Sequence, residues 1–485
     1  MIDFNNLGSY RENNRLEAKT ALGGLPQSIW ETYSAFANTL GGIILLGVSE
    51  KPDHSFEAVD LPEPGSLIQA FWDIVNNPNK VSINLLSEKD VYPFEVNGKH
   101  IVVMNIPRAD RSYRPVYLDG NPLNTYRRNG EGDYKCTREE YQAMVRDAAV
   151  KTQDMQVLTD MDLSVFNSDS IRSYRQRMRL SRPGHVWEEL DDEAFLQKID
   201  AAGIGEDGKM HPTAAGLLMF GNESDIVREY NNYSLDYQEQ YDRRKRWTDR
   251  IVSSSGDWSG NVYDFYFRVY NKLRQDIKTP FKLDGVTCVD DTPVRQALRE
   301  ALANCLVNAD YYGRQGVVII KKPRLITLSN PGGLRIGLAT ALSGGVSDPR
   351  NSAMLRMFNL VDIGERAGSG IPNIFRVWKE QKWSEPVIAE EFEPDRITVT
   401  LPLSAVSVAG GGQSAKVVDK SAVKEKVKNS ILLYLTDHPD GRTAEIAAFL
   451  SMSTSRARDY MKELVNDGSV EVFRSNRKRI YRLKR

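Results

Sequence analysis

Short hydrophobic patterns predict an alternation of strands and helices over the first 150 residues. Alternating apolar and polar side chains place Glu17 and Lys19 on one face of a short strand. Apolar side chains then recur at helical spacing over 29–38, and two glycines follow as a stop signal. The apolar run 43–48 indicates a buried strand that delivers Glu50 to its exit. This part of the chain is therefore expected to form an α+β domain.

The remaining chain is predicted to hold two larger segments, a linker and a small terminal domain. Residues 160–278 read as mostly helical. The next segment opens with a long helix, continues with strands and Gly-rich turns, and closes on the alternating run 396–401. Gly, Ser, Ala and Lys dominate the stretch after it, which is typical of a flexible tether. The predicted fold is an α+β multidomain chain with an N-terminal domain at 1–150, a helical connector at 151–279, an α/β segment at 280–403, a linker at 404–422 and a terminal domain at 423–485.

Length and composition agree with a folded protein of several domains. The chain has 485 residues, which suggests about three domains. Its content of 41% hydrophobic and 27% charged residues excludes a largely disordered chain. The three cysteines are too widely spaced for a disulfide framework or a zinc pattern. No apolar stretch approaches the ~20 residues of a membrane span, so we expect a soluble, cytoplasmic protein without a membrane partner.

Three acidic residues near the N-terminus are candidate metal ligands. Glu12 precedes the first strand, Glu17 lies on it, and Glu50 follows the buried strand. Converging carboxylates repel each other unless protons or a divalent cation are present, and hard cations such as Mg²⁺ or Mn²⁺ prefer oxygen ligands. Metal-assisted cleavage of a phosphodiester needs such a site. The alternative is that these are solvated carboxylates flanking strands.

The residues around these acids resemble the Schlafen-type AlbA domain. The resemblance rests on the pattern E-x4-E-x-K from Glu12 to Lys19, on AFANTLGG at 35–42 and on the segment 114–140. It implies a metal-dependent RNA-cutting site at the three acids, with Lys19 beside them. The family usually carries Asp in the third place, so Asp53 is an alternative to Glu50. Many bacterial members of the family are nucleic-acid binders or regulators, and the phosphate contacts predicted beside the acids are Lys19, Arg127 and Arg128.

A second constellation combines a polar helix stripe with two Gly-rich loops. The helix 294–310 places Glu300, Asn304 and Asn308 four residues apart on one face, opposite an apolar face. A tight SNPGGL turn follows at 329–334, and the loop GERAGSGI at 364–371 opens another helix. Glycines in such loops let backbone N–H groups approach phosphate. The Walker sequence GxxxxGK[ST] is absent from the chain, which argues against a P-loop enzyme.

In this order the three elements resemble the N, G1 and G2 boxes of GHKL ATPases, in particular a RecG C-terminal-like branch that is joined to Schlafen-type AlbA domains. The resemblance implies a Bergerat α/β sandwich that binds ATP. Glu300 would act as general base, and Asn304 would hold Mg²⁺ with the phosphates. Asn330 stands where the family carries the Asp that reads adenine. The alternative is a Bergerat fold that has lost its nucleotide and acts in dimerisation. The remaining predicted nucleotide contacts are Asn308, Gly332, Gly333, Gly368, Ser369 and Gly370.

The terminal domain reads as a winged helix-turn-helix. Short helices at 443–450 and 453–467 are followed by two strands around a turn at 475–476. The formal net charge of the whole chain is −1, so nucleic-acid binding has to come from local basic surfaces such as this one. The alternative is that this domain packs against protein. The predicted contacts are Arg456, Arg458, Lys462, Arg474, Arg477, Lys478 and Arg479.

Together these patterns predict a nucleic-acid effector controlled by ATP. The favoured hypothesis is a Mg- or Mn-dependent RNA endonuclease that works as a homo-oligomer, and the family resemblance suggests anti-phage defence. The alternative is an ATP-responsive transcription regulator that binds DNA without cutting it. A third hypothesis makes the chain a scaffold in a larger complex.

Overall fold

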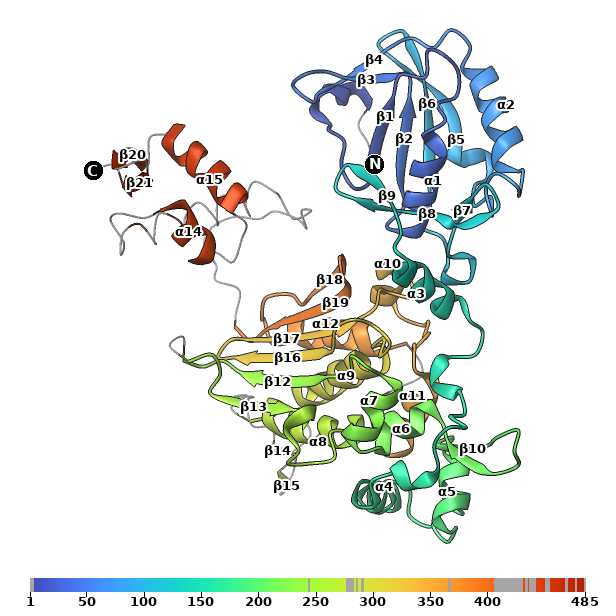
Figure 1. The fold of residues 1–485 in the computed structure, drawn as a ribbon, viewed down its shortest axis with the longest axis vertical. Coiled ribbons are helices and arrows are strands. Elements are labelled where there is room, and N and C mark those ends of the chain that lie inside the picture. The colour runs from blue at the N-terminus through green and yellow to red at the C-terminus, as the bar shows by residue number, and fades with distance from the viewer. Residues whose placement is uncertain are drawn as a thin grey trace. The chain divides into compact units, whose positions relative to one another are not determined.

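The computed structural model describes residues 4–242, 245–275, 283–284, 287–288, 292–364, 368–404, 431, 435, 442–449, 454–466, 470–475 and 478–483. The chain divides into two compact units, residues 1–406 and residues 407–485, which are described separately (Figure 1).

The N-terminal domain opens with a set of strands and helices whose bounds are β1 Leu16–Lys19, α1 Ile29–Asn38, β2 Gly42–Leu46, β3 Val48–Glu50, β4 Phe56–Ala58, α2 Pro64–Val75, β5 Val91–Val96 and β6 Lys99–Ile106. Four of these strands form one sheet in the order β1-β2-β6-β5, in which β1 and β2 are parallel. The helices α1 and α2 pack on one face, and the hairpin β3-β4 packs on the other. Because β2 is buried on both faces, its sequence is a continuous apolar run.

The single strand expected over 43–48 is in fact two strands in different sheets. Gly47 lies between β2 and β3 with a φ of 80°. A Cβ atom at this position would lie 2.7 Å from Leu61 Cγ. The positive φ redirects the chain, and the close approach of Leu61 leaves no room for a side chain. This turn places Glu50 at the end of the β3-β4 hairpin.

A three-stranded sheet and one helix complete this domain: β7 Tyr117–Leu118, β8 Asn121–Asn129, β9 Gly132–Lys135 and α3 Arg138–Ala148. The strand order is β7-β8-β9. The fully buried Asn38 donates from Nδ2 to the carbonyls of Val116 (2.8 Å) and Tyr126 (3.1 Å) and so ties α1 to β8. Thr137 and Glu140 form a capping box that fixes the start of α3.

The second domain, called the sheet domain below, is built on six strands: β12 Leu235–Glu239, β13 Asp249–Val252, β16 Val317–Lys322, β17 Leu325–Pro331, β18 Val387–Phe392 and β19 Asp395–Pro402. Their order is β13-β12-β16-β17-β19-β18, and only β12 and β16 pair in parallel among these six (Figure 1). Three helices, α8 Val262–Leu273, α9 Pro293–Val307 and α12 Gly370–Glu380, pack together and against the sheet.

The predicted helical connector at 151–279 is not a separate helical segment. It supplies β12 and β13 to the six-stranded sheet and α8 to the helices beside it. The strand β12 is only five residues long, and its partner β16 lies about eighty residues further along the chain. Local periodicity carries no information about such a pairing, so the domain boundary predicted at residue 279 is crossed by the sheet.

The other elements are α4 Ser168–Ser181, α5 Asp192–Lys198, β10 Ala202–Ile204, β11 Met210–Pro212, α6 Ala214–Phe220, α7 Glu223–Glu229, β14 Leu283–Asp284, β15 Thr287–Cys288, α10 Leu338–Ser343 and α11 Ser352–Leu360. One hydrophobic core runs from Tyr174 on α4 through the fully buried helix α6 to Trp378 on α12. None of the described helices is long and apolar enough to cross a membrane.

The elements described in the C-terminal unit are α14 Thr443–Phe449, α15 Thr454–Asn466, β20 Val470–Ser475 and β21 Lys478–Leu483. The strands pair antiparallel, and the hairpin packs on α15 through Val470 and Tyr481. The helices predicted at 443–450 and 453–467 and the two predicted strands correspond to these elements. The linker expected at 404–422 lies outside the described residues except for Ser404.

Candidate functional site

A cavity of about 130 Å³ in the sheet domain brings together the residues predicted to bind a nucleotide. It lies between α9, the turn after β17 and the start of α12. Its lining includes seven of the nine predicted residues: Glu300, Asn304, Asn308, Asn330, Gly333, Gly368 and Gly370. Of the other two, Gly332 lines a neighbouring pocket, and Ser369 is the N-cap residue of α12.

The polar residues of this cavity form a ladder along α9. Asn304 Nδ2 donates to Glu300 Oε1 (3.1 Å), and Asn308 Nδ2 donates to the carbonyl of Asn304 (2.9 Å). Asn330 Nδ2 donates to the carbonyl of Pro331 (3.2 Å). A Cβ atom on Gly370 would lie 2.2 Å from Glu300 Oε1, so a larger residue there would displace this carboxylate. The glycine therefore keeps the acidic end of the ladder close to the N-terminus of α12.

Apolar side chains form the rest of the wall. Ile374 comes from α12, and Ile397 and Val399 come from β19. Cys305 also lines the cavity, and burial raises the pKa of its thiol to about 12. It is therefore a neutral thiol at physiological pH and contributes as a small apolar group. An apolar cavity with amide groups and a helix N-terminus suits a ligand that has both a flat ring and an anionic group.

The three candidate acids of the N-terminal domain lie within electrostatic range of one another. The pKa of Glu12 is raised, first because its carboxyl group is partly buried and then because of the charges of Glu17 and Glu50. A hydrogen bond from the backbone N–H of Ala18 to Glu12 Oε1 (3.1 Å) partly offsets this rise. The charges of Glu17 and Glu50 therefore act on the carboxyl group of Glu12.

Two of the acids are already engaged by cationic or ionisable groups. Glu17 contacts Lys19 Nζ through Oε1 (2.8 Å) and Arg128 Nη2 through Oε2 (2.7 Å). Glu50 Oε1 lies 2.7 Å from His54 Nδ1. The alternative third acid, Asp53, accepts hydrogen bonds from Ser55 in its own loop. Among the described residues, no three His, Cys, Asp or Glu side chains form a group that would hold a metal ion. As arranged here, these residues do not fit a resident Mg²⁺ or Mn²⁺.

The electrostatics of Glu12 lead to a prediction for the variant Glu12→Gln. Since the pKa of Glu12 is raised in the folded state, its ionised form weakens folding at neutral pH, and this penalty disappears as the pH falls through the folded pKa. Glutamine keeps the oxygen that accepts from Ala18, so we expect stability at pH 7 to rise by up to about 1 kcal/mol. Urea denaturation measures this change. The control is Glu95→Gln, which replaces an exposed glutamate of β5. A loss of stability in Glu12→Gln alone would contradict the prediction.

Arg127 and Arg128 do not lie at a solvated strand edge. They are 8% and 3% exposed, and as neighbours on β8 they point in opposite directions. Arg127 pairs with Asp395 (2.6 Å) of the sheet domain, and Arg128 pairs with Glu17 and with Asp133 (2.9 Å). Both side chains are buried and paired with carboxylates, so a phosphate group would have to displace an acidic partner to reach either of them.

The basic residues of the C-terminal unit are only partly described. Arg458 and Lys462 are exposed on α15. The side chains of the other predicted contacts lie outside the described residues, namely Arg456, Arg474, Arg477, Lys478 and Arg479.

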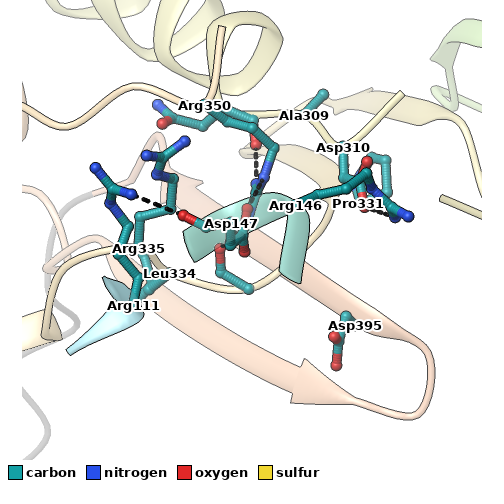
Figure 2. A network of polar contacts seen from close by, with 12 residues as sticks. Arg111, Arg146, Asp147, Ala309, Asp310, Pro331, Leu334, Arg335, Arg350 and Asp395 are labelled. Atoms are coloured by element: carbon teal, nitrogen blue, oxygen red, sulfur yellow. Dashed lines mark hydrogen bonds and ion pairs between the residues drawn. The ribbon is translucent and has the colours of Figure 1, made fainter. Parts of the chain in front are cut away.

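A network of ion pairs that was not predicted from the sequence joins the two domains of the first unit. Figure 2 shows Arg350 reaching Asp147, and the neighbouring Arg146 reaching Asp310. Arg108 adds a further pair with Glu390 on β18 (2.7 Å). The partners are 164 to 282 residues apart in the sequence. No local pattern signals such pairs.

Two of these arginines reach the cavity of the sheet domain through its wall. Arg350 Nη2 donates to the carbonyl of Gly333 (3.0 Å), and Arg108 Nη2 donates to the carbonyl of Leu334 (3.0 Å). Gly333 and Leu334 both line the cavity. The N-terminal domain, which supplies Arg108 and the partner of Arg350, therefore contacts the cavity wall directly.

Comparisons with known proteins identify individual domains. The family described as Schlafen, AlbA_2 matches residues 12–137, and the family described as putative ATP-dependent DNA helicase recG C-terminal matches residues 315–401. A domain of unknown function matches residues 142–236, and a FaeA-like protein family matches residues 427–479. No curated protein gives a significant match.

Two solved structures match this chain in the structural comparison. One is a crystal structure of a protein from Corynebacterium diphtheriae, with 15% identity over 97% of this chain and 95% of that chain and a TM-score of 0.40. The other is an NMR structure of the N-terminal domain of a putative ATP-dependent DNA helicase RecG-related protein from Nitrosomonas europaea, with 28% identity over 28% of this chain and 95% of that chain and a TM-score of 0.23. The family matches confirm both domain resemblances: the chain carries a Schlafen AlbA_2 domain and a domain of the RecG C-terminal type.

Proposed function

We propose that this protein is a nucleotide-responsive nucleic-acid-binding protein. An adenine nucleotide binds the cavity of the sheet domain and changes how the AlbA_2 domain engages RNA or DNA. One observation carries the proposal: the cavity unites the predicted nucleotide residues, and its wall is bonded to the N-terminal domain through Arg108 and Arg350.

The residues of the cavity fit a nucleotide. The amide ladder offers oxygen and N–H groups, and Gly370 leaves room for the Glu300 carboxylate beside the start of α12. In the proposed complex Asn304 holds Mg²⁺ with the phosphates, Glu300 orients or deprotonates water, and Gly368 and Gly370 offer backbone N–H groups to phosphate. The volume of about 130 Å³ is below the ~300 Å³ of typical ligand pockets, so the loops around it have to open for a nucleotide.

Replacement of Asn304 by alanine tests the nucleotide site. We expect the affinity for ATP to fall by about tenfold, because a metal and phosphate contact worth about 1.4 kcal/mol is lost. Isothermal titration calorimetry on the full chain with MgATP measures this change. Asn373→Ala is the matched control, because Asn373 lies on α12 but does not line the cavity. Equal affinities in both variants would contradict the proposed site.

RNA cleavage at Glu12, Glu17 and Glu50 is a second candidate function. The observation that supports it is the pKa of Glu12, which is raised first by partial burial and then by the charges of Glu17 and Glu50. For Glu17 to act on a substrate, it would have to release Lys19 or Arg128, which now occupy its oxygens. Anti-phage defence is the proposed setting for this function, and transcription regulation is the setting for binding without cleavage.

A nuclease assay separates the two candidates. Labelled tRNA, single-stranded RNA and duplex DNA are incubated with Mg²⁺ or Mn²⁺, with and without ATP, beside the double variant Glu12→Gln/Glu17→Gln. Cleavage by the unmodified chain alone establishes the nuclease. Binding that responds to ATP in both proteins, without cleavage, supports the regulator. We further propose that the C-terminal unit is a winged helix that contributes to nucleic-acid binding, and that the protein acts as a homo-oligomer.

A further inference from the structure

The cavity of the sheet domain contains one buried arginine that the sequence analysis does not single out. Among the described residues that line it, the charged side chains are Glu300, Arg335 and Asp348. Arg335 is therefore the one cation of this described lining, and it is 7% exposed. A phosphate chain that enters a buried cavity needs a cation, because an unpaired charge is costly away from water.

Arg335 shares its carboxylate partner with an arginine of the N-terminal domain. Arg335 Nη2 lies 3.1 Å from Asp348 Oδ1, and Arg335 Nε lies 3.4 Å from Asp348 Oδ2. Arg111 Nε donates to the same Oδ2. Arg111 also donates to the carbonyl of Asp147 (2.7 Å), so it is fixed on the side of the N-terminal domain. Asp348 therefore has two arginine partners, Arg111 from the N-terminal domain and Arg335 from the sheet domain.

The charges around Arg335 do not fully offset the effect of burial on the pKa of its guanidinium. Burial lowers the pKa of its guanidinium, Asp348 offsets this only in part, and the charges of Arg111 and Arg350 lower the pKa further. The charge of Asp147 opposes these two arginines. An anionic ligand next to Arg335 would oppose the effect of burial on its pKa, as Asp348 does now.

We propose that Arg335 binds the phosphate chain of the nucleotide by leaving Asp348, which stays paired with Arg111. This inference rests on the proposed nucleotide site and extends it by one binding residue and one positioning residue. The exchange leaves no carboxylate unpaired, because Arg111 already holds Asp348. The planar guanidinium of Arg335 suits bidentate contact with phosphate oxygens. Arg111 thus acts on nucleotide affinity from outside the cavity, and the N-terminal domain takes part in nucleotide binding.

The first test compares ATP with adenosine by calorimetry on the full chain. In Arg335→Ala we expect ATP to bind at least about tenfold more weakly and adenosine to bind unchanged, since only the phosphate contact is lost. Arg335→Lys keeps the positive charge but lacks the planar guanidinium. Its affinity for ATP should lie between those of the unmodified chain and Arg335→Ala. If the unmodified chain binds neither ligand, the proposed function fails. If Arg335→Ala binds ATP as tightly as the unmodified chain, the role of Arg335 is overturned while the nucleotide site stands.

The second test is a double-mutant cycle on Arg111 and Asp348. In Arg111→Ala, Asp348 would have no arginine partner once Arg335 turns to the phosphate. We therefore expect ATP to bind several-fold more weakly. In Asp348→Asn, Arg335 is released in advance, so ATP should bind several-fold more tightly. In the Asp348→Asn background, Arg111→Ala should have no further effect. The control Arg172→Ala removes an exposed arginine of α4. If Arg111→Ala still weakens ATP binding in the Asp348→Asn background, the shared-carboxylate arrangement is overturned. This result does not depend on Arg335→Ala, so it decides the question even if that variant also loses adenosine binding.

Discussion

Replacement of Arg350 by alanine should lower the free energy of unfolding by about 3–5 kcal/mol. The side chain of Arg350 is 8% exposed, and its Nε and Nη2 atoms lie 2.8 Å from the two carboxylate oxygens of Asp147. It also donates to the carbonyls of Gly333 and Asn308. Alanine would leave a buried carboxylate and two carbonyls without these donors. Urea denaturation followed by tryptophan fluorescence measures the loss.

The control for this experiment is an exposed ion pair on α12. Arg376 lies 2.6 Å from Glu380 one helical turn away, and both side chains are about half exposed or more. Arg376→Ala should cost less than about 1 kcal/mol, as exposed pairs usually do. Similar losses in the two variants would mean that the buried pair contributes no more than a surface pair.

The contribution of the Asp147–Arg350 pair should depend on pH. Burial by itself would raise the pKa of Asp147, but the charge and hydrogen bonds of Arg350 more than offset this, and the pKa is lowered. A lowered pKa means that the pair stabilises the fold above the unfolded pKa of about 3.9 and that this stability is lost as the pH falls through the folded pKa. The difference between the unmodified chain and Arg350→Ala should therefore be fully present at pH 7 and shrink below about pH 4.

Replacement of Arg128 by alanine should also cost about 3–5 kcal/mol. Its side chain is 1% exposed and joins Glu17 (2.7 Å) to Asp133 (2.9 Å), and Nη2 also donates to the carbonyl of Asn13 (3.0 Å). The variant would leave two acids without their shared cation. The pKa of Glu12 should rise further, because the charge of Arg128 now lowers it. Denaturation measures the stability, and a carboxyl titration by NMR follows Glu12.

The same variant separates a structural role from a nucleic-acid contact. If Arg128 bound phosphate, Arg128→Ala would weaken RNA binding and leave the free energy of unfolding unchanged. The ion pairs in the structure lead to the opposite expectation, with a large loss of stability. Arg128→Lys is the second variant: it keeps a positive charge but cannot reach both acids with a planar fork, so its loss should be intermediate.

Local sequence patterns were sufficient for most elements around the candidate sites. The helical spacing over 29–38 and the run after Gly41 correspond to α1 and β2. The stripe of Glu300, Asn304 and Asn308 lies on one face of α9 and lines the cavity, as a repeat of four residues requires. These features depend on neighbours within about one or two helical turns, so composition and spacing carry the information.

Sequence alone could not show which charges meet across the fold. Alternation on β8 places Arg127 and Arg128 on opposite faces, but it does not reveal that Asp395 and Glu17 cover those faces. The partners lie more than a hundred residues away, and a basic pair on a strand looks the same whether it faces solvent or a buried carboxylate.

The amino-acid pattern by itself determined the local helices and strands, the resemblance to AlbA_2 and RecG C-terminal domains, and seven of the residues that line the cavity of the sheet domain. Tertiary packing determined the membership of β12 in the six-stranded sheet, the engagement of Glu17 by two cations and the place of Arg335 beside Asp348. The physical reason is that strand pairing and buried ion pairs join residues that are distant in sequence. Their energies depend on desolvation, which only the folded arrangement defines.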